Sequence, residues 1–369
     1  MKQIGIGVIG WGFMGRTHTF SIKTMPLHYN LDFEPRLIGI CSRRLEKAEQ
    51  AAREQGFKYA TDDYHKLLAD PEIDVVSICT PNNLHEQMAL DAIAAGKNVY
   101  IDKPLSINYE SARRIADAAR AAGVKAQLAL NNRFFPSTML AHELVTSGKL
   151  GRVTSFSAEY LHSGSVDPDR PIGWKQDYDA CGGGVLLDLG SHALDLVIWM
   201  CGKVDSIDCI TQTLYPERPT AGGGRTSNLG EDRALMLLQL ENGAAGTVDA
   251  SKIATGTDDE LKINIYLTGG AVRYSSLCGD YLDVYDSSSG AAGFTHVHCG
   301  GRYAQPGGTF IPAKNAVGWI RGHVHSYYKF LEAVASGGEC APSLDDGAYL
   351  QLVMDKAYES NRIGGRVKV

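Results

Sequence analysis

A glycine-rich turn, G-W-G-F-M-G at residues 10–15, directly follows the apolar run of residues 4–9 near the start of the chain. The run is rich in β-branched side chains, which predicts a buried strand, and the residues after the glycines can continue as a helix. In such a unit Gly10 allows the tight turn, Gly12 lets a pyrophosphate approach the backbone, and Gly15 lets the helix pack against the strand. The N-terminus of the helix would offer its N–H groups to the phosphates. We therefore expect a dinucleotide site; the alternative is a turn with a structural role only.

The alternation of strands and helices continues through the first third of the chain. Further strands are expected at residues 37–41, 74–79, 98–101 and 125–130, with helices at residues 45–56, 84–95 and 109–122. Continuous apolar strands separated by helices of this length are typical of βαβ units in a parallel sheet.

After about Asn131 the pattern changes. Strands are expected at residues 152–162, 204–215, 234–240, 244–253 and 261–267, and helices at residues 136–147, 184–200, 323–335 and 345–361. The later strands follow one another without helices between them, so they should pair mainly antiparallel. We therefore predict an α/β fold with an N-terminal Rossmann parallel sheet, residues 1–131. A C-terminal α+β domain, residues 132–369, would be built on a mainly antiparallel open sheet, and its terminal helices either stay with it or pack back on the first domain.

Composition excludes several classes of protein. At about 150 residues per domain, 369 residues agree with two domains. The 36 Lys and Arg against 42 Asp and Glu give a net charge of −6, which does not supply the basic field of a nonspecific nucleic-acid binder. No apolar run reaches the roughly 18 residues of a membrane span, and the start lacks the shape of a signal peptide. The eight cysteines form no C-x-x-C pair. We expect a cytoplasmic protein that binds neither nucleic acid nor membrane.

The end of the second expected strand bears on which dinucleotide binds. An Asp or Glu at this point would accept hydrogen bonds from the adenosine ribose and repel a 2′-phosphate. The chain instead reads Cys41-Ser42-Arg43-Arg44. Ser42 can donate a hydrogen bond to a phosphate oxygen and Arg43 can pair with it, so NADP(H) is modestly favoured over NAD(H). The alternative is that the arginines only solvate the start of the next helix.

Four further motifs occur at the expected junctions. Thr80-Pro81-Asn82 with His85 follows the third strand, Asp102-Lys103-Pro104 the fourth and Asn131-Asn132-Arg133-Phe134 the fifth, while Asp188 and His192 lie in the helix that Gly182-Gly183-Gly184 opens. Together with the glycine turn, these motifs resemble the Gfo/Idh/MocA oxidoreductases over essentially the whole chain. In that family the acid before Lys-Pro is usually Glu, and here it is Asp102, which is one methylene shorter and leaves Lys103 in place.

The chemistry of an alcohol dehydrogenase requires a base for the hydroxyl proton while hydride leaves the same carbon. Asp188 and His192, at i and i+4, share one face of a helix, and an imidazole exchanges protons near neutrality. Lys103 follows a strand's carboxyl end, where it can stabilise developing alkoxide charge. The resemblance implies that Lys103, Asp188 and His192 are the catalytic set, with His192 as the preferred acid/base. The alternative is that Asp188 caps a helix and His192 is a buried structural histidine.

The expected contacts with cofactor and substrate are as follows. The cofactor-binding residues would be Gly10, Gly12, Phe13, Met14, Gly15, Ser42, Arg43, Thr80, Pro81, Asn82, His85, Asp102, Lys103 and Asn131. The substrate-binding residues would be Lys103, Arg133, Tyr160, Trp174, Asp188 and His192. Asn131 and Arg133 could equally brace the domain junction, and Tyr160 could be ordinary sheet packing. The histidine pairs His296/His298 and His323/His325 lack a matching acidic or cysteine cluster, so no metal is expected.

These observations lead to one main functional hypothesis and two alternatives. The main hypothesis is an NAD(P)-dependent dehydrogenase that acts on a ring hydroxyl of a sugar, glycoside or cyclitol. The alternatives are an NAD-dependent glycosidase that oxidises its sugar only transiently, and a dinucleotide-binding regulator without catalysis. The resemblance also implies a homodimer or homotetramer formed through the open face of the C-terminal sheet.

Overall fold

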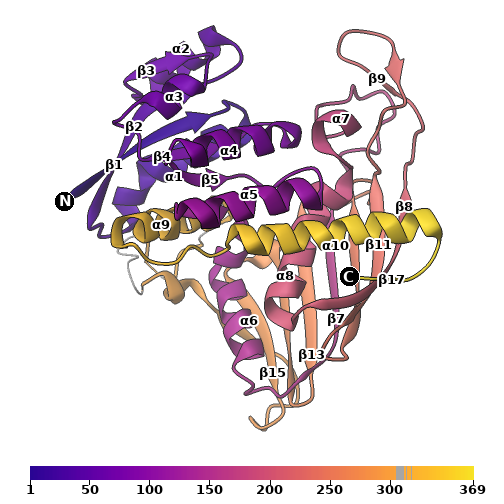
Figure 1. The fold of residues 1–369 in the computed structure, drawn as a ribbon. Coiled ribbons are helices and arrows are strands. Elements are labelled where there is room, and N and C mark those ends of the chain that lie inside the picture. The colour runs from indigo at the N-terminus through magenta and orange to yellow at the C-terminus, as the bar shows by residue number, and fades with distance from the viewer. Residues whose placement is uncertain (305–310, 313, 317) are drawn as a thin grey trace. The chain divides into compact units, whose positions relative to one another are not determined.

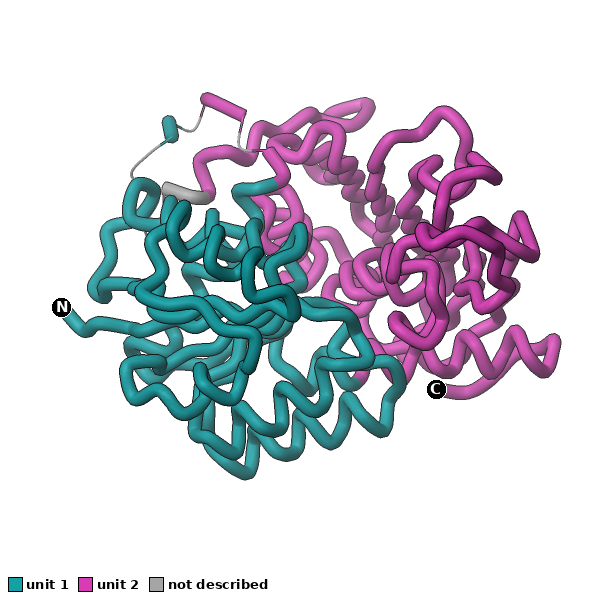
Figure 2. The backbone as a smooth tube through the Cα atoms, turned by 90° about the horizontal axis from the view of Figure 1, so that it is seen from above, with its two compact units in different colours: residues 1–131, 303–312, 320–348 teal, residues 132–302, 313–319, 349–369 magenta. Residues whose placement is uncertain are grey.

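The structure, a computed structural model, describes residues 1–304, 311–312, 314–316 and 318–369. The chain divides into two compact units, which Figure 2 shows in different colours. Unit 1 contains residues 1–131, the described part of residues 303–312, and residues 320–348. Unit 2 contains residues 132–302, the described part of residues 313–319, and residues 349–369. The segment 132–369 therefore contributes to both units.

Unit 1 is built on a six-stranded parallel sheet with the strand order β3-β2-β1-β4-β5-β6. Its strands are β1 (Lys2–Ile9), β2 (Phe33–Cys41), β3 (Tyr59–Thr61), β4 (Val75–Ile78), β5 (Asn98–Ile101) and β6 (Ala126–Leu128). Its helices include α1 (Phe13–His28), α2 (Leu45–Gln55), α3 (His65–Ala69), α4 (His85–Ala94) and α5 (Tyr109–Ala122). This strand order is that of the Rossmann fold, which confirms the predicted fold class. The order reverses between β1 and β4, and ligands of such sheets bind at this switch point, beyond the carboxyl ends of the strands.

Strand β3 was not expected from the sequence, and the packing of α9 (Trp319–Ser336) was left open between the two domains. Strand β3 has three residues, too few for a periodic pattern. Helix α9 carries Tyr327 and Phe330, both 0% exposed, in the same core cluster as Ile4 and Ile6 of β1. The apolar face of α9 is thus buried on unit 1, so this helix packs back on the Rossmann sheet, as one of the two alternatives held.

Unit 2 is built on a nine-stranded sheet with the order β16-β15-β14-β13-β7-β12-β11-β8-β17 (Figure 1). The strands are β7 (Val153–Leu161), β8 (Val204–Gln212), β11 (Arg233–Leu240), β12 (Ala245–Ser251), β13 (Glu260–Leu267), β14 (Gly270–Ser275), β15 (Tyr281–Asp286), β16 (Thr295–His298) and β17 (Val367–Lys368). Two short strands, β9 (Arg218–Pro219) and β10 (Arg225–Thr226), pair separately. All neighbours in the large sheet pair antiparallel except β7 and β12, which are parallel. The mainly antiparallel sheet is therefore confirmed.

Among the described residues, helices pack on one face of this sheet and none packs on the other. Helix α8 (Ser191–Cys201) packs on β7, β12 and β13, and α6 (Pro136–Thr146) packs on β14 and β15. The remaining helices of the unit are α7 (Tyr178–Cys181) and most of α10 (Leu344–Ile363). Burial alternates along β11, where Met236 and Leu238 are buried while Leu235 and Leu237 are exposed. The exposed side chains mark the face without helices.

One stretch among the described residues, Tyr178–Cys201, is long and apolar enough to cross a membrane by length and composition. Its most apolar window is 83% buried inside the protein. A buried core helix passes the same test, so this stretch is weak evidence for a membrane span.

Candidate active site

The three glycines of the first turn differ in what surrounds them. Gly10 has φ +105°, and a Cβ built on it would lie 2.5 Å from the carbonyl oxygen of Cys79. A Cβ on Gly15 would lie 2.0 Å from the carbonyl oxygen of Gly10. At Gly12 a Cβ would meet nothing within 4 Å. The chain itself therefore requires glycine at the first and third positions, whereas the second leaves space that a ligand lying on the backbone can use.

Helix α1 begins at this turn in a way that suits an anion. Its N-cap is Gly12, no side chain caps it, and no acidic residue lies in its first turn. The first N–H groups of a helix have no partners within the helix, and they carry the positive end of its dipole. Phe13 is 70% exposed and Met14 is half-buried, so both residues of this predicted cofactor contact are accessible at the surface of unit 1. The local geometry fits the pyrophosphate of a dinucleotide.

The end of β2 lies beside this turn. The Gly10 N–H donates to the carbonyl oxygen of Cys41 at 2.9 Å, which ties the glycine turn to the last residue of β2. The Ser42 N–H donates to the carbonyl oxygen of Thr61 at 3.1 Å. Ser42 is half-buried and Arg43 is exposed. Both predicted contacts are therefore accessible at the point where the adenosine ribose of a Rossmann cofactor would lie.

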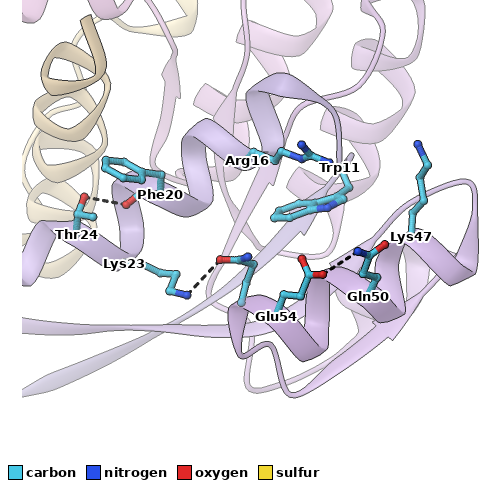
Figure 3. A pocket seen from close by; sticks show the side chains of 9 residues that line it. Trp11, Arg16, Phe20, Lys23, Thr24, Lys47, Gln50 and Glu54 are labelled. Carbon is cyan, nitrogen blue, oxygen red and sulfur yellow. Dashed lines mark hydrogen bonds between the residues drawn. The ribbon is translucent and has the colours of Figure 1, made fainter. Parts of the chain in front are cut away.

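A groove of about 460 Å³ opens between α1 and α2, with Trp11 of the glycine turn in its wall (Figure 3). Its lining residues are Trp11, Arg16, Phe20, Lys23, Thr24, Lys47, Gln50, Glu54 and Gln55. The Arg16 guanidinium lies 6.0 Å from the centre of the Trp11 ring. Three cationic side chains against one carboxylate give the groove a positive balance, which favours an anionic group.

The loops after β4 and β5 are joined by a buried histidine. His85 is 0% exposed, and its ring nitrogens Nδ1 and Nε2 each lie 3.0 Å from a carbonyl oxygen, those of Pro104 and Thr80 respectively. Burial lowers the pKa of His85, so the ring is neutral near pH 7 and donates to one carbonyl at a time. The ring of His85 therefore links the Thr80 loop to the Lys103 loop, and its predicted contact with the cofactor stays a prediction.

The residues of those two loops lie at the carboxyl edge of the parallel sheet. Thr80 and Pro81 are half-buried and Asn82 is buried. Asp102 and Lys103 are half-buried directly after β5, and the Lys103 N–H donates to Asp102 Oδ1 at 2.9 Å. This bond uses one carboxylate oxygen to hold the backbone of the proposed catalytic lysine. Asp102 thus positions Lys103, whatever contact the shorter acid makes with the cofactor.

Asn131, after β6, is 3% exposed. Its Nδ2 is buried and has no hydrogen-bond partner among the described residues. A buried amide donor without an acceptor is costly, and an amide ligand would satisfy it. Asn131 therefore fits the nicotinamide carboxamide, one of the two roles the sequence left open.

Behind the glycine turn lies a buried polar cluster that the sequence analysis missed. The Nδ1 atom of His18, on α1, lies 2.8 Å from Ser77 Oγ and 3.0 Å from Cys79 Sγ. Burial lowers the pKa of His18 to about 4, against a smaller opposing effect of Asp102. His18 is therefore a neutral hydrogen-bonding group beneath the predicted cofactor site. No motif signals it, because a histidine inside an amphipathic helix has no characteristic spacing.

In unit 2, the predicted Asp188–His192 pair lies at the change from a π-helical turn, Leu186–Gly190, to α8. A wider turn of this kind is common at functional sites. The Asp188 carboxylate is held from both sides: Lys175 Nζ lies 2.7 Å from Oδ1, and Lys252 Nζ lies 3.0 Å from Oδ2. The helix that the sequence predicted over residues 184–200 is thus π-helical at its start.

His192 is 8% exposed, and its ring centre lies 5.8 Å from that of Tyr160 on β7. Burial, followed by the charge of Asp259, raises the pKa of the Tyr160 phenol, so the phenol stays protonated. Burial lowers the pKa of His162, and Lys252 acts in the same direction. Tyr160 and His192 are thus brought together as predicted substrate contacts within unit 2, while Lys103 belongs to unit 1.

Two other predicted substrate contacts have different surroundings. Arg133 is 8% exposed, and its Nε and Nη2 atoms donate to both carboxylate oxygens of Asp195 on α8. Its guanidinium also lies 5.4 Å from the centre of the Trp199 ring. This pairing lies within unit 2, where the donors of the guanidinium serve a buried carboxylate, and the two predicted roles of Arg133 stay open. Trp174 is 42% exposed, with Lys175 Nζ 5.9 Å from its ring centre, and is open to a ligand.

The second glycine-rich turn, Gly182–Gly184, holds the start of this helical region in place. Gly182 has φ +77°. A Cβ on Gly183 would lie 2.2 Å from the hydroxyl oxygen of Tyr358, and one on Gly184 would lie 2.2 Å from the carbonyl oxygen of Glu231. The chain itself requires all three glycines, so that two backbone segments can meet below Asp188.

Lys252, in unit 2, is another residue near the predicted site that was not expected from the sequence. It follows β12 and is 5% exposed. The available signal was a lysine near the end of the expected strand 244–253, which also holds Asp249, because a lysine in a strand needs a partner if it is buried. The sequence could not show that this partner is Asp188.

Comparison with known proteins agrees with these features. Residues 4–130 match an oxidoreductase family described as having an NAD-binding Rossmann fold, and residues 138–273 match the GFO/IDH/MocA C-terminal domain. Levoglucosan dehydrogenase of Pseudarthrobacter phenanthrenivorans is 31% identical over 98% of this chain and 96% of its own length. Myo-inositol 2-dehydrogenase of Thermotoga maritima is 27% identical over 70% of this chain and 72% of its own length.

Solved structures give the same result. Levoglucosan dehydrogenase in complex with NADH and levoglucosan matches with a TM-score of 0.95 and 31% identity, covering 100% of this chain and 99% of that chain. The same dehydrogenase in complex with NADH and L-sorbose matches equally well, with a TM-score of 0.95. With both of its domains matched and a full-length relative above 30% identity, the chain belongs to the Gfo/Idh/MocA family of oxidoreductases with an NAD-binding Rossmann fold.

Proposed function

We propose that the protein is an NAD(P)-dependent dehydrogenase that transfers hydride between the nicotinamide and a ring hydroxyl of a sugar, glycoside or cyclitol. The observation that carries this proposal is the pair Asp188 and His192, in which a carboxylate fixed by two ammonium groups precedes a buried imidazole by four residues. The names of the relatives, levoglucosan dehydrogenase and myo-inositol 2-dehydrogenase, support the substrate class.

The proposed roles follow from the chemistry of each group. His192 takes the hydroxyl proton as alcohol becomes carbonyl and returns a proton in the reverse direction. Lys103 donates a hydrogen bond to the reacting oxygen and stabilises the charge that develops on it. Asp188 accepts a hydrogen bond from a substrate hydroxyl and fixes the orientation of the ring. When NAD(P)⁺ is bound, it supplies the hydride acceptor.

An activity screen tests the function directly. Purified protein with each cofactor and a panel of aldoses, glycosides and inositols should change the nicotinamide absorbance with at least one substrate class. Glycoside cleavage without a net change in absorbance would favour the NAD-dependent glycosidase instead. Tight cofactor binding with no turnover of any panel member would contradict both enzymes and favour a regulator.

For the cofactor, we propose that NADP(H) is used in preference to NAD(H). Support comes from the accessible Ser42 and Arg43 at the end of β2, from the absence of an acid at residues 42–44, and from the positive balance of the Arg16 and Lys47 groove. The ratio of kcat/KM for NADP to kcat/KM for NAD measures the preference. Arg43→Ala should lower this ratio, while Glu46→Ala, in the first turn of α2, should not lower it. A clear preference of the unchanged protein for NAD would overturn the proposal.

We further propose a homodimer or homotetramer formed through the open face of the nine-stranded sheet, in the cytoplasm. Leu235 and Leu237 on β11 are exposed there, and Ile210, the partner of Leu235 in the ladder, is 70% exposed. An apolar group of this kind on a sheet face is typical of an interface. Leu235→Glu should lower the mass in solution, whereas Leu277→Glu, at an exposed leucine outside the large sheet, should not. A monomeric mass of the unchanged protein at micromolar concentration would contradict the proposal.

The cytoplasmic location is supported by the state of the cysteines. All eight are free thiols in the structure, and five of them are buried. Unpaired buried cysteines are typical of proteins from reducing compartments. Fractionation of the source cells with an antibody to the protein would test this location.

A further inference from the structure

The buried lysine that no sequence motif marked, Lys252, contacts the proposed substrate-binding carboxylate. Its side chain is 6% exposed, and its Nζ lies 3.0 Å from Asp188 Oδ2. The other ammonium on this carboxylate, that of Lys175, lies 2.7 Å from Oδ1 on a side chain that is 48% exposed. The two lysines thus differ in burial although they hold the same carboxylate.

The backbone of Lys252 is held on both sides of the peptide chain. Its N–H donates to the carbonyl oxygen of Asp232 at 2.8 Å, and its own carbonyl oxygen accepts from the Ser165 N–H at 2.8 Å. A buried ammonium is expensive to desolvate unless an opposite charge lies close to it. Asp188 provides that charge. The side chain of Lys252 is therefore held in one position, and it holds the Asp188 carboxylate. The exposed side chain of Lys175 loses more conformational freedom when it pairs with the same carboxylate.

The charged and titratable groups of unit 2 that face this ion pair come from most of the surrounding elements. The charge of Asp188 or Lys252 acts on Tyr160 and His162 from β7 and its end, on Cys181 from α7, and on Glu231 before β11. Lys175 contacts Asp188 directly, and Asp259, before β13, acts on Tyr160 and His162. His192, in α8, follows Asp188 by four residues. The charge of Lys252 contributes to the pKa shifts of three of them: it lowers that of His162 in the same direction as burial, and it opposes the burial that raises those of Cys181 and Glu231. Lys252 is thus a source of positive potential for the whole cluster.

We propose that Lys252 is a positioning residue of the dehydrogenase reaction, acting through Asp188; this inference rests on the function proposed above. Lys252 keeps Asp188 ionised and oriented, so that Asp188 only accepts a hydrogen bond from the substrate and His192 carries the proton. An opposite charge within about 4 Å favours the ionised form of a carboxylate. The second cation leaves the Lys175–Asp188–Lys252 group with a net positive charge, which also favours the neutral, proton-accepting form of a nearby imidazole.

The kinetic test uses Lys252→Met, which keeps most of the side-chain volume and removes the charge. We expect kcat to fall about 10- to 100-fold, because a misplaced substrate-binding group costs that much. The acid limb of the kcat/KM profile should move up by about one pH unit, since loss of a cation raises the pKa of whichever group must be deprotonated. Cofactor affinity should be unchanged. Lys252→Arg should restore the position of the acid limb.

A matched control is Lys175→Met, which removes the exposed partner of the same carboxylate. We expect a smaller shift of the acid limb from this variant, because solvent already screens the exposed pair. Equal shifts from the two variants would contradict the special role of the buried lysine. The proposal is overturned if Lys252→Met matches the unchanged protein in three measurements. These are an equal melting temperature, an acid limb of the kcat/KM profile at the same pH, and a kcat within about twofold.

A second measurement does not depend on turnover. Aspartate labelled with ¹³C at the carboxyl carbon reports the titration of Asp188 by NMR without any substrate, and Asp188→Asn assigns the signal. The Asp188 midpoint should rise by about one pH unit in Lys252→Met. An unchanged Asp188 midpoint in Lys252→Met would overturn the inference even if no substrate is found. A raised midpoint would support the electrostatic role of Lys252. If the unchanged protein then turned over no substrate, the proposed function would be contradicted while this role would stand. Lys252→Gln serves for the same measurement if Lys252→Met does not fold.

Discussion

The two glycine-rich turns of this protein use the same residue for different purposes. In unit 1, Gly10 and Gly15 are required by contacts of the chain with itself, but the space at Gly12 is open. In unit 2, each glycine of Gly182–Gly184 is required by the chain: Gly182 by a positive φ, and Gly183 and Gly184 by close approach to other residues. The first turn can therefore offer its backbone to a ligand, whereas the second is filled by protein and presents the side chains that follow it.

The largest expected effect is a loss of turnover without a loss of cofactor binding. It tests whether the residues after the second turn serve the chemistry while the first turn binds the cofactor. His192→Ala removes the proposed proton acceptor, so kcat should fall by about 10²- to 10⁴-fold. NAD(P)H affinity, measured by fluorescence titration, should stay nearly the same, because the proposed phosphate contacts are in unit 1. The exposed histidine variant His65→Ala is the control. Turnover near that of the unchanged protein would remove His192 from the catalytic set.

The next effect is on folding. Gly184→Ala places a Cβ where the carbonyl oxygen of Glu231 would be 2.2 Å away, which forces two backbone segments apart. We expect the free energy of unfolding to fall by about 1–3 kcal/mol, the usual result of overpacking. Gly222→Ala, in a loop of the same unit where a Cβ meets nothing within 4 Å, is the matched control. Equal melting temperatures for the two variants would show that the second turn is not sterically filled.

Gly12→Ala should give the opposite pattern. Its φ of −92° is open to alanine and its Cβ has no neighbour, so the free energy of unfolding should change by no more than about 0.5 kcal/mol. The methyl group would occupy the space that a pyrophosphate needs, so Kd for NAD(P)H should rise at least about tenfold, or about 1.4 kcal/mol. Calorimetry of binding and of unfolding on the same sample measures both. A loss of stability together with intact binding would reverse the comparison of the two turns.

The last effect is gradual and concerns the pH dependence of stability that the buried histidines of unit 1 cause. Burial lowers the pKa of His18 to about 4, and burial with the charge of Arg321 lowers that of His325 to about 3. Between about pH 6.5 and those values the unfolded chain binds more protons than the folded one, so stability is present at neutral pH and is lost as the pH falls. Each such histidine should cost roughly 1.4 kcal/mol per pH unit in that range.

Urea unfolding at pH 8, 7, 6 and 5 measures this dependence. His325→Gln should reduce the slope of the free energy of unfolding against pH below about pH 6.5 by the contribution of one histidine. The loss of the hydrogen bond between His325 and Tyr29 should lower the free energy of unfolding equally at every pH, including pH 8. Parallel curves for the variant and the unchanged protein would show that His325 is not held neutral in the fold.

Much of the architecture could be predicted, because it depends on local patterns. The glycine turn, the alternation of strands and helices and the change of pattern after Asn131 are all visible within short windows. The motif residues Lys103, Asp188 and His192 could be named from spacing and from the family resemblance. Strand β3, with three residues, had no such pattern, and the parallel pairing of β7 with β12 joins strands far apart in the sequence.

The sequence by itself determined the βαβ alternation of the first unit, the dinucleotide turn and the residue types available for chemistry, because each depends on residues close together in the sequence. Only the tertiary structure decided that His85 joins two loops, that Arg133 pairs with Asp195, that α9 packs on unit 1 and that Lys252 meets Asp188. Burial and charge pairing arise between segments that the chain brings together only on folding. The protonation states that govern the proposed chemistry depend on those pairings, so they cannot be read from a motif.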